Sequence, residues 1–160
     1  MKDFFVKWYA YNAWANDRVL RAMEKQDVHD ESILRLFSHL LSAQFIWLNR
    51  IKGLPTEPFP LWQVYKLSEL RTMTEDAAQN WNAFIESQKS FRHILKYRNY
   101  VGDYYENDVE QIMIHLVNHG SYHRGQIALL MRQKGYERIH ILMSRKCDQI
   151  RQGQRKGSGH

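Results

Sequence analysis

Two histidines stand four residues apart in the segment HGSYHRGQ, which runs from His119 to Gln126. In an α-helix, residues at i and i+4 lie on one face, one turn apart. A step of four residues rises about 6 Å, and two imidazoles at this spacing can bind one metal ion through bonds of about 2.0–2.1 Å. The same spacing also suits a pair of structural, hydrogen-bonded histidines. The pair alone leaves both interpretations open.

The surrounding sequence indicates that both histidines face the interior of the protein. Apolar residues repeat with helical period at Ile112, Leu116, Ile127 and Leu130. His119 and His123 fall in the middle of this stripe, and buried imidazoles need partners for their ring nitrogens. His115 falls at its edge. Because His115 lies about 12 Å of helix rise from His123, one ion cannot bind both. His115 with His119 remains a competing, less central pair.

A third ligand for such an ion must come from another segment. The candidates are His29, His39, His93 and His140. His29 lies in a predicted loop, His93 near the end of a predicted helix, and His140 in a segment without clear periodicity. His39 lies at the border between the apolar and polar arcs of its helix, which is typical of a surface histidine. Periodicity alone does not choose among the four.

Hydrophobic periodicity predicts four helices to position these residues. They span about 4–26, 31–52, 68–96 and 108–134. Asp30 or Ser32 is expected to cap the second helix, and Gly53 and Gly135 are expected to end the second and fourth. These elements predict an all-α fold, a four-helix bundle.

The connecting segments add three expectations. The long loop 54–65 between the second and third helices holds all three prolines. Residues 97–107, around Gly102, carry β-type residues and are expected to be extended or to form a short hairpin. Residues 139–150 are expected to form a short extra C-terminal segment, either a fifth helix or an extended arm. Residues 1–150 then form a single domain, followed by a basic tail, 151–160, whose last four residues resemble a linker and part of a purification tag.

Composition narrows the class of protein. The chain has 160 residues, 44% of them hydrophobic, which is enough for one domain with a core. It lacks a run of about 18 apolar residues, and its first residues lack the long apolar region and small-residue cleavage site expected of a signal peptide. Its one cysteine, Cys147, allows no intrachain disulfide. We therefore expect a cytoplasmic protein that does not bind membranes.

The net charge of +6 raises the question of nucleic-acid binding. Much of the excess lies in the tail, from Arg145 onwards, and the other basic residues are scattered. The sequence has no recognisable nucleic-acid motif and no dense basic stripe on one helix. We therefore expect a solvated basic surface and no nucleic-acid partner.

Three segments resemble helices of the DinB/YfiT-like family, in the order in which that family has them. These segments are YNAWANDRVL (11–20), HLLSAQFIWLNRIKG (39–53) and HLVNHGSYHRGQIALLMRQKG (115–135). The pattern NH-x3-HRGQ in the last segment is the most specific feature. The resemblance covers most of the chain but is poor from residue 139 onwards.

The resemblance implies a four-helix bundle, often a homodimer, that holds one divalent metal ion on three histidines. The family pattern maps these ligands onto His39, His119 and His123. Nickel or zinc is the expected metal, although three neutral imidazoles also suit iron or copper. Some relatives are transferases that use a low-molecular-weight thiol. The resemblance therefore implies a metal-dependent thiol transferase acting on an electrophilic or xenobiotic small molecule. The alternative is a non-catalytic metal-binding protein of the stress response.

Other polar residues of the predicted helices are expected mainly to have structural roles rather than catalytic ones. No glutamate forms an HExxH pattern with the histidines, which argues against a zincin-like hydrolase. Asn12, Asn16 and Gln44 lie on inward faces, where hydrogen bonds between helices are favoured over a role in the site. Arg124 is predicted to point away from the apolar stripe, into a salt bridge or helix-end contact. Tyr122 suits packing as well as proton donation, and no catalytic residue is assigned.

Overall fold

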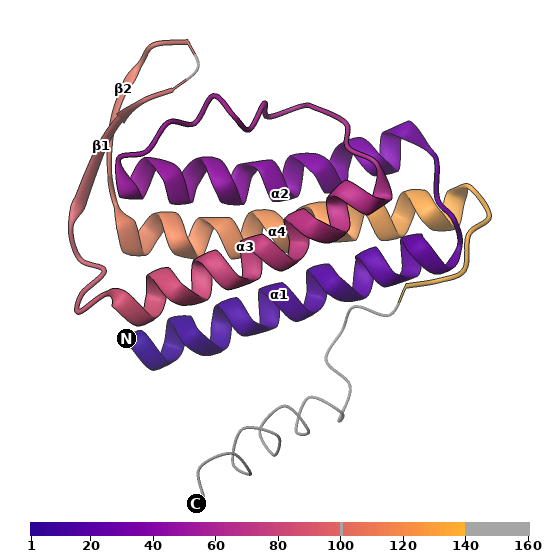
Figure 1. Ribbon diagram of the computed structural model, residues 1–160, viewed down its shortest axis with the longest axis horizontal. Helices are drawn as coiled ribbons and strands as arrows, with labels where there is room; N and C mark the ends of the chain where they lie inside the picture. The colour runs from indigo at the N-terminus through magenta and orange to yellow at the C-terminus, as the bar shows by residue number, and fades with distance from the viewer. Residues whose placement is uncertain (100, 140–160) are drawn as a thin grey trace, which may run out of the picture.

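The computed structural model describes residues 1–99 and 101–139. Its elements follow the order α1 (Lys2–Lys25), α2 (Glu31–Lys52), α3 (Leu67–Ser87), β1 (Ile94–Arg98), β2 (Tyr104–Asp108) and α4 (Val109–Gln133). The four helices lie side by side, and α1 and α2 each contact both α3 and α4 (Figure 1). The two strands form a small antiparallel sheet that projects beyond one end of the helices. The protein is therefore mostly helical but not all-α.

The ends of α2 lie where the sequence predicts them. The Asp30 carboxylate accepts hydrogen bonds from the backbone N–H groups of Ser32 and Ile33, which satisfies donors that have no partner inside the helix. Gly53 ends the helix in the left-handed conformation, at φ +67°. The predicted bounds of α1 and α4 are also correct to within two residues.

The third helix is shorter than predicted. The expectation of a helix over 68–96 was wrong at its C-terminal end, because α3 ends at Ser87 and Gln88 is extended. The Ser87 hydroxyl donates to the Phe84 carbonyl, which otherwise lacks a partner in the last turn. Leu95, predicted in the core of this helix, instead lies in β1 and packs partly buried against the core.

The hairpin explains why the helix stops. Residues 94–98, with sequence ILKYR, pair with residues 104–108, so that Ile94 lies opposite Asp108 and Arg98 opposite Tyr104. This partner strand satisfies the backbone groups that a longer helix would have satisfied internally. The prediction of an extended region or hairpin over 97–107 is confirmed, although the hairpin begins three residues earlier.

Two clusters of buried apolar side chains hold the helices together. The first joins all four helices and includes Leu20, Phe37, Leu41, Leu70 and Ile127. The second packs the N-terminal half of α4 against α1 and α3 and includes Phe5, Trp81, Phe91, Met113 and Leu116. Because α2 and α4 share the first cluster, side chains on their facing surfaces are held in a fixed relation.

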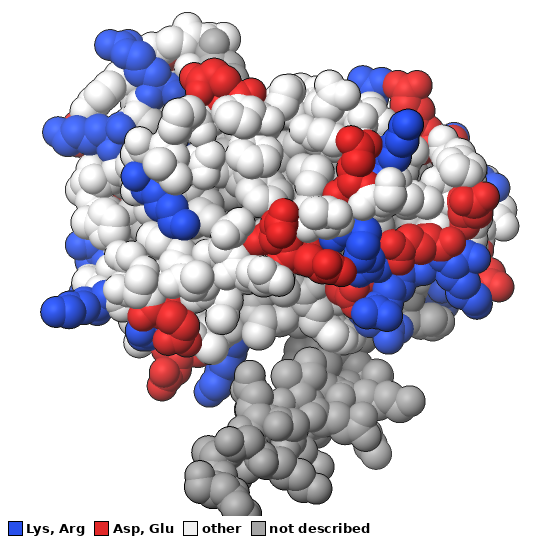
Figure 2. Space-filling model, in the orientation of Figure 1, with Lys and Arg blue, Asp and Glu red and all other residues white. Residues whose placement is uncertain are grey.

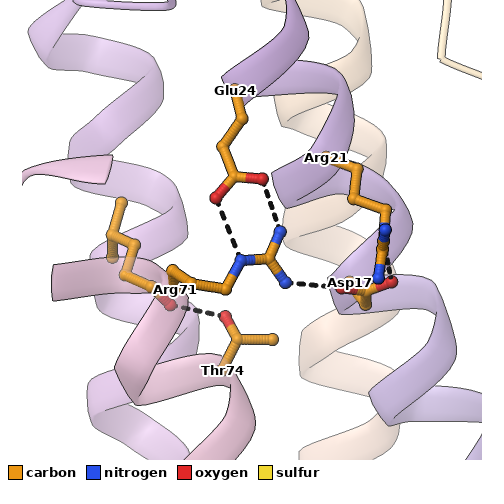
Figure 3. Close-up of polar contacts among 6 residues, drawn as sticks. Asp17, Arg21, Glu24, Arg71 and Thr74 are labelled. Carbon is orange, nitrogen blue, oxygen red and sulfur yellow. Dashed lines mark hydrogen bonds and ion pairs between the residues drawn. The ribbon is translucent and has the colours of Figure 1, made fainter. Parts of the chain in front are cut away.

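An ion-pair cluster adds a polar link between α1 and α3 (Figure 3). The Arg71 guanidinium lies 2.6 Å from an Asp17 oxygen and 2.5 Å from a Glu24 oxygen. These carboxylates, Glu24 first, raise the pKa of Arg71. Partial burial acts to raise the pKa of Asp17, but hydrogen bonds from Arg21 and Arg71 outweigh it and the pKa is lowered. The Asp17 carboxylate therefore stays ionised and paired at neutral pH.

The molecular surface carries charges of both signs. On the face in Figure 2, acidic and basic side chains are interspersed rather than gathered into one basic patch. None of the helices within residues 1–99 and 101–139 combines the length and apolar character needed to span a bilayer. The predictions for Cys147, His140, the tail 151–160 and, apart from Ile139, the segment 139–150 concern residues outside those that the structure describes.

Candidate metal centre

Three histidines from two helices meet at one point. His39 comes from α2, and His119 and His123 come from α4. The Nε2 atom of His119 lies 3.1 Å from Nε2 of His39 and 3.1 Å from Nε2 of His123. One ligand atom from each of the three residues lies within 4.8 Å of the others. This group is referred to below as the histidine triad.

Contacts at the opposite ring nitrogens set the tautomers of two of these rings. His39 Nδ1 lies 3.1 Å from the carbonyl oxygen of Leu61, which can only accept a hydrogen bond. His123 Nδ1 lies 2.7 Å from the side-chain oxygen of Gln126. Both Nδ1 atoms therefore carry the proton, and each Nε2 atom presents a lone pair to the centre of the triad.

The three rings cannot satisfy one another by hydrogen bonding. His119 Nε2 faces two acceptor nitrogens and can donate at most one proton. A cation at the centre would accept all three lone pairs. Two nitrogens bound to one ion at about 2.0–2.1 Å and a tetrahedral angle lie about 3.3–3.4 Å apart. The separation of 3.1 Å is close to this value, so the residues fit a small divalent ion.

Burial keeps the triad uncharged. His39 and His123 are 7% and 8% exposed, and His119 is half-buried. Burial is the main cause of a lowered pKa at each of the three, and for His119 the neighbouring histidines add to the effect and lower the pKa to about 3. Neutral imidazole is the form that binds metal ions. The triad is therefore ready to bind an ion at neutral pH without first losing protons.

The loop between α2 and α3 covers His39. This loop runs back along α2 (Figure 1), and the Trp62 ring stacks on the His39 ring at 3.9 Å between centroids and 10° between planes. Leu61 of the same loop accepts the hydrogen bond described above. The interpretation of His39 as a surface histidine was therefore wrong. A helical wheel considers one helix at a time. It does not include the loop between α2 and α3, which covers the border of the apolar face of α2.

The other histidines that the structure describes lie apart from the triad. His115 is exposed, and its ring centroid lies 5.8 Å from that of His119. His29 is exposed and lies 3.0 Å from the Asp27 carboxylate. His93 is exposed in the segment before β1. The structure thus places none of these three within the group of converging ligand atoms.

Arg124, next to His123, is buried. The prediction that it points away from the apolar stripe was wrong, because its side chain is only 1% exposed. Its guanidinium donates hydrogen bonds to Asn12 at 2.7 Å and Asn16 at 2.6 Å, both on α1. Asn12 in turn donates to Gln44 on α2 at 3.3 Å. These three amides have the interhelical role that the sequence favours for them.

Gly120 makes room for this buried arginine. A Cβ atom at Gly120 would lie 2.8 Å from Arg124 Nη1 and 2.9 Å from Asn12 Oδ1, closer than such atoms approach. A glycine in the middle of a helix disfavours the helix, which indicates that another group approaches closely there. This glycine, one turn before Arg124, is the feature of the sequence that could have revealed the polar contact between α1 and α4.

Two comparisons with known proteins identify the family of this chain. The model of the DinB family matches residues 1–153. The chain is also 27% identical over 153 residues to Protein DinB of Bacillus subtilis (strain 168), an alignment that covers 85% of this chain and 89% of that protein. Since the family match spans nearly the whole sequence, and includes the helices that carry the three histidines, the chain belongs to the DinB family.

Proposed function

We propose that His39, His119 and His123 bind one divalent metal ion, nickel or zinc, through their Nε2 atoms. One observation carries this proposal: three Nε2 atoms converge, and two of them must be acceptors because their Nδ1 protons are donated elsewhere. Three protein ligands leave at least one coordination position open, which is typical of a catalytic rather than a structural site.

We further propose that the centre activates a low-molecular-weight thiol for transfer to an electrophilic or xenobiotic small molecule. A bound divalent ion would lower the pKa of a coordinated thiol and hold it as the reactive thiolate. The chain supplies neutral ligands, and the loop that carries Leu61 and Trp62 covers one side of the centre. In the transfer, the thiolate sulfur forms a bond to an electrophilic carbon, and the leaving group departs with its bonding electrons.

We propose that the protein acts in the cytoplasm, where thiols are kept reduced. Its partner there is a small-molecule substrate, and it has no membrane or nucleic-acid partner. The interspersed surface charges in Figure 2 support the last point. We also propose a homodimer, supported by three large apolar side chains that α4 exposes to solvent, Ile114, Tyr122 and Leu129.

Spectroscopy and turnover together test the thiol step. Protein loaded with cobalt(II) is expected to develop a thiolate-to-metal absorption band when a low-molecular-weight thiol is added. With the native metal, it is expected to conjugate a thiol to a chlorinated aromatic compound and to release chloride. Metal-free protein and the His119→Ala variant are the controls. If no thiol gives metal-dependent turnover, the alternative of a non-catalytic metal-binding stress-response protein replaces the transferase.

A further inference from the structure

A cavity of about 270 Å³ adjoins the histidine triad. Besides His39 and His119, its lining includes Trp47 and Arg50 of α2, Tyr97 and Tyr105 of the hairpin, and His115 of α4. A second cavity, of about 300 Å³, shares Trp47, Tyr97 and His115 with the first. The two form a recess between α2, α4 and the hairpin that leads to the metal ligands.

Aromatic rings form much of this recess and hold its arginine. The Arg50 guanidinium carbon lies 5.0 Å from the centre of the Trp47 ring and 5.2 Å from that of Tyr97. Tyr97 meets Trp47 edge-on at 5.0 Å and stacks on Tyr105 at 5.7 Å. A guanidinium that stacks on ring faces binds carboxylates through the N–H groups on its edge. The rings therefore orient Arg50 and offer flat apolar surfaces beside it.

The described residues that line the cavity next to the triad include a basic side chain but no carboxylate. Among the described residues that line the cavity next to the triad, Arg50 is the only Lys, Arg, Asp or Glu. Asp103 bonds to Asn99 at the end of the hairpin but does not line the cavity. The three neutral histidines cancel none of the charge of a divalent ion. A molecule in the recess thus meets positive charge at the triad and at Arg50.

We propose that this recess binds a small aromatic carboxylate, with the carboxylate bonded to Arg50 and the ring packed against Trp47 and Tyr97. The inference builds on the proposed metal centre and names the chemical class of the small molecule that it serves. A neutral molecule of the same shape loses the charge-assisted hydrogen bonds to Arg50. Such bonds change affinity by about ten- to a hundredfold.

Titration calorimetry with benzoate and the neutral benzamide tests this inference. The zinc-loaded full-length protein is expected to bind benzoate at least about tenfold more tightly than benzamide, as expected for a charge-assisted hydrogen bond. The Arg50→Gln variant is expected to bind the two within about twofold of each other, because it lacks that bond. Arg50→Lys keeps the charge without the fork of donors, and is expected to retain part of the preference.

Arg35→Gln is the matched control for Arg50→Gln. It removes the same charge from the same helix, about 22 Å away along the α2 axis, and Arg35 pairs with Glu31 on the surface. Its preference for benzoate is expected to equal that of the unchanged protein. Circular dichroism of each variant verifies that it is folded, and Arg50→Lys provides the test if Arg50→Gln does not fold.

Two results would overturn the inference. One is equal binding of benzoate and benzamide by the unchanged protein. The other is a preference for benzoate that survives in Arg50→Gln, which would place the carboxylate on the metal ion instead.

Zinc titration of the metal-free protein separates this inference from the proposed function. Zinc binding at the triad without a benzoate preference supports the metal centre and overturns the carboxylate recess. If zinc does not bind, the benzoate titration is carried out on the metal-free protein. A preference there that depends on Arg50 supports the recess and contradicts the metal centre, and its absence contradicts both.

Discussion

Each ring of the histidine triad has its protonation state set by its immediate surroundings. His39 and His123 donate from Nδ1 to Leu61 and Gln126, and burial disfavours the charged form of all three rings. The two Nδ1 contacts turn the Nε2 lone pairs of His39 and His123 toward Nε2 of His119. The fold holds the three rings neutral and close together, and a bound ion would offset the cost of this crowding by accepting their lone pairs.

Metal binding is therefore expected to release few protons. At pH 6, three histidines with ordinary pKa values near 6.5 would together release about two protons. The triad, with its lowered pKa values, is expected to release fewer than about one. Calorimetric titration with zinc in buffers of different ionisation enthalpy measures this number, and a release of two protons would contradict the neutral triad.

The same shifts predict how acid affects the metal-free protein. The pKa of His119 is about 3 in the folded chain and near 6.5 in the unfolded chain. Between these values the unfolded chain takes up a proton that the folded chain does not bind. The free energy of unfolding is therefore expected to decrease as the pH falls from about 7 to about 4. Urea titrations across this range measure it, and a rise in stability on acidification would refute the assignment.

Gln126 is expected to act on the metal through His123. Its side-chain oxygen holds the Nδ1 proton of that ring at 2.7 Å. Loss of such a contact weakens metal binding by about 10- to 100-fold. Gln126→Leu is expected to show this loss, whereas Gln126→Glu keeps an acceptor and is expected to bind zinc well. Competition with a chelator measures the affinity, and Gln133→Leu, on the exposed last turn of α4, is the control.

The three histidines of the triad differ in how far the sequence alone could predict them. His119 and His123 could be predicted because their spacing is a property of one helix, and helical periodicity places both on the inward-facing side. His39 could not, since its burial depends on Leu61 and Trp62, which lie more than twenty residues away in a loop. Only the resemblance to a known family connected His39 with the other two.

At the scale of elements, α4 carries both histidines proposed as ligands and the contact that fixes the helix against α1. Arg124 bonds to Asn12 and Asn16, and Gly120 leaves room for it. The residues that position α4 thus alternate along the helix with the proposed metal ligands. An error in packing at Gly120 would be expected to disturb His119 and His123 as well.

Substitution of two glycines in α4 tests this arrangement. Gly120→Ala places a Cβ against two buried atoms that bond to each other, and is expected to lower the free energy of unfolding by about 1–3 kcal/mol. Gly125→Ala meets nothing within 4 Å and is expected to be neutral or to stabilise the helix by up to about 1 kcal/mol. Chemical denaturation of the metal-free proteins compares them, and equal stabilities would contradict the close approach at Gly120.

Helix ends marked by capping residues in the local sequence were predicted well. Asp30 caps the start of α2 through local hydrogen bonds, and Gly53 ends the helix with a positive φ. Both residue types can be recognised in the sequence as helix caps. The end of α3 has no such signal. Ser87 is followed by a segment whose structure depends on pairing with residues 104–108, and helical periodicity could not reveal that partner.

At the scale of the whole molecule, the triad joins α2 to α4 across the bundle. An ion bound there stabilises the folded chain only, because the unfolded chain does not bring the three rings together. At a free metal concentration 100-fold above Kd, the stabilisation is about 2.7 kcal/mol, or roughly 5–10 °C in Tm for a chain of this size. Thermal unfolding with and without zinc measures this shift, which His119→Ala is expected to abolish.

The most direct measurement of the central claim is the metal content of protein purified without a nickel column. Elemental analysis is expected to find one divalent ion per chain, and less than a tenth of that in His39→Ala, His119→Ala and His123→Ala. His115→Ala, which removes an exposed histidine next to the triad, is expected to retain the full amount. Unchanged metal content in all three triad variants would contradict the assignment of these histidines as the metal ligands.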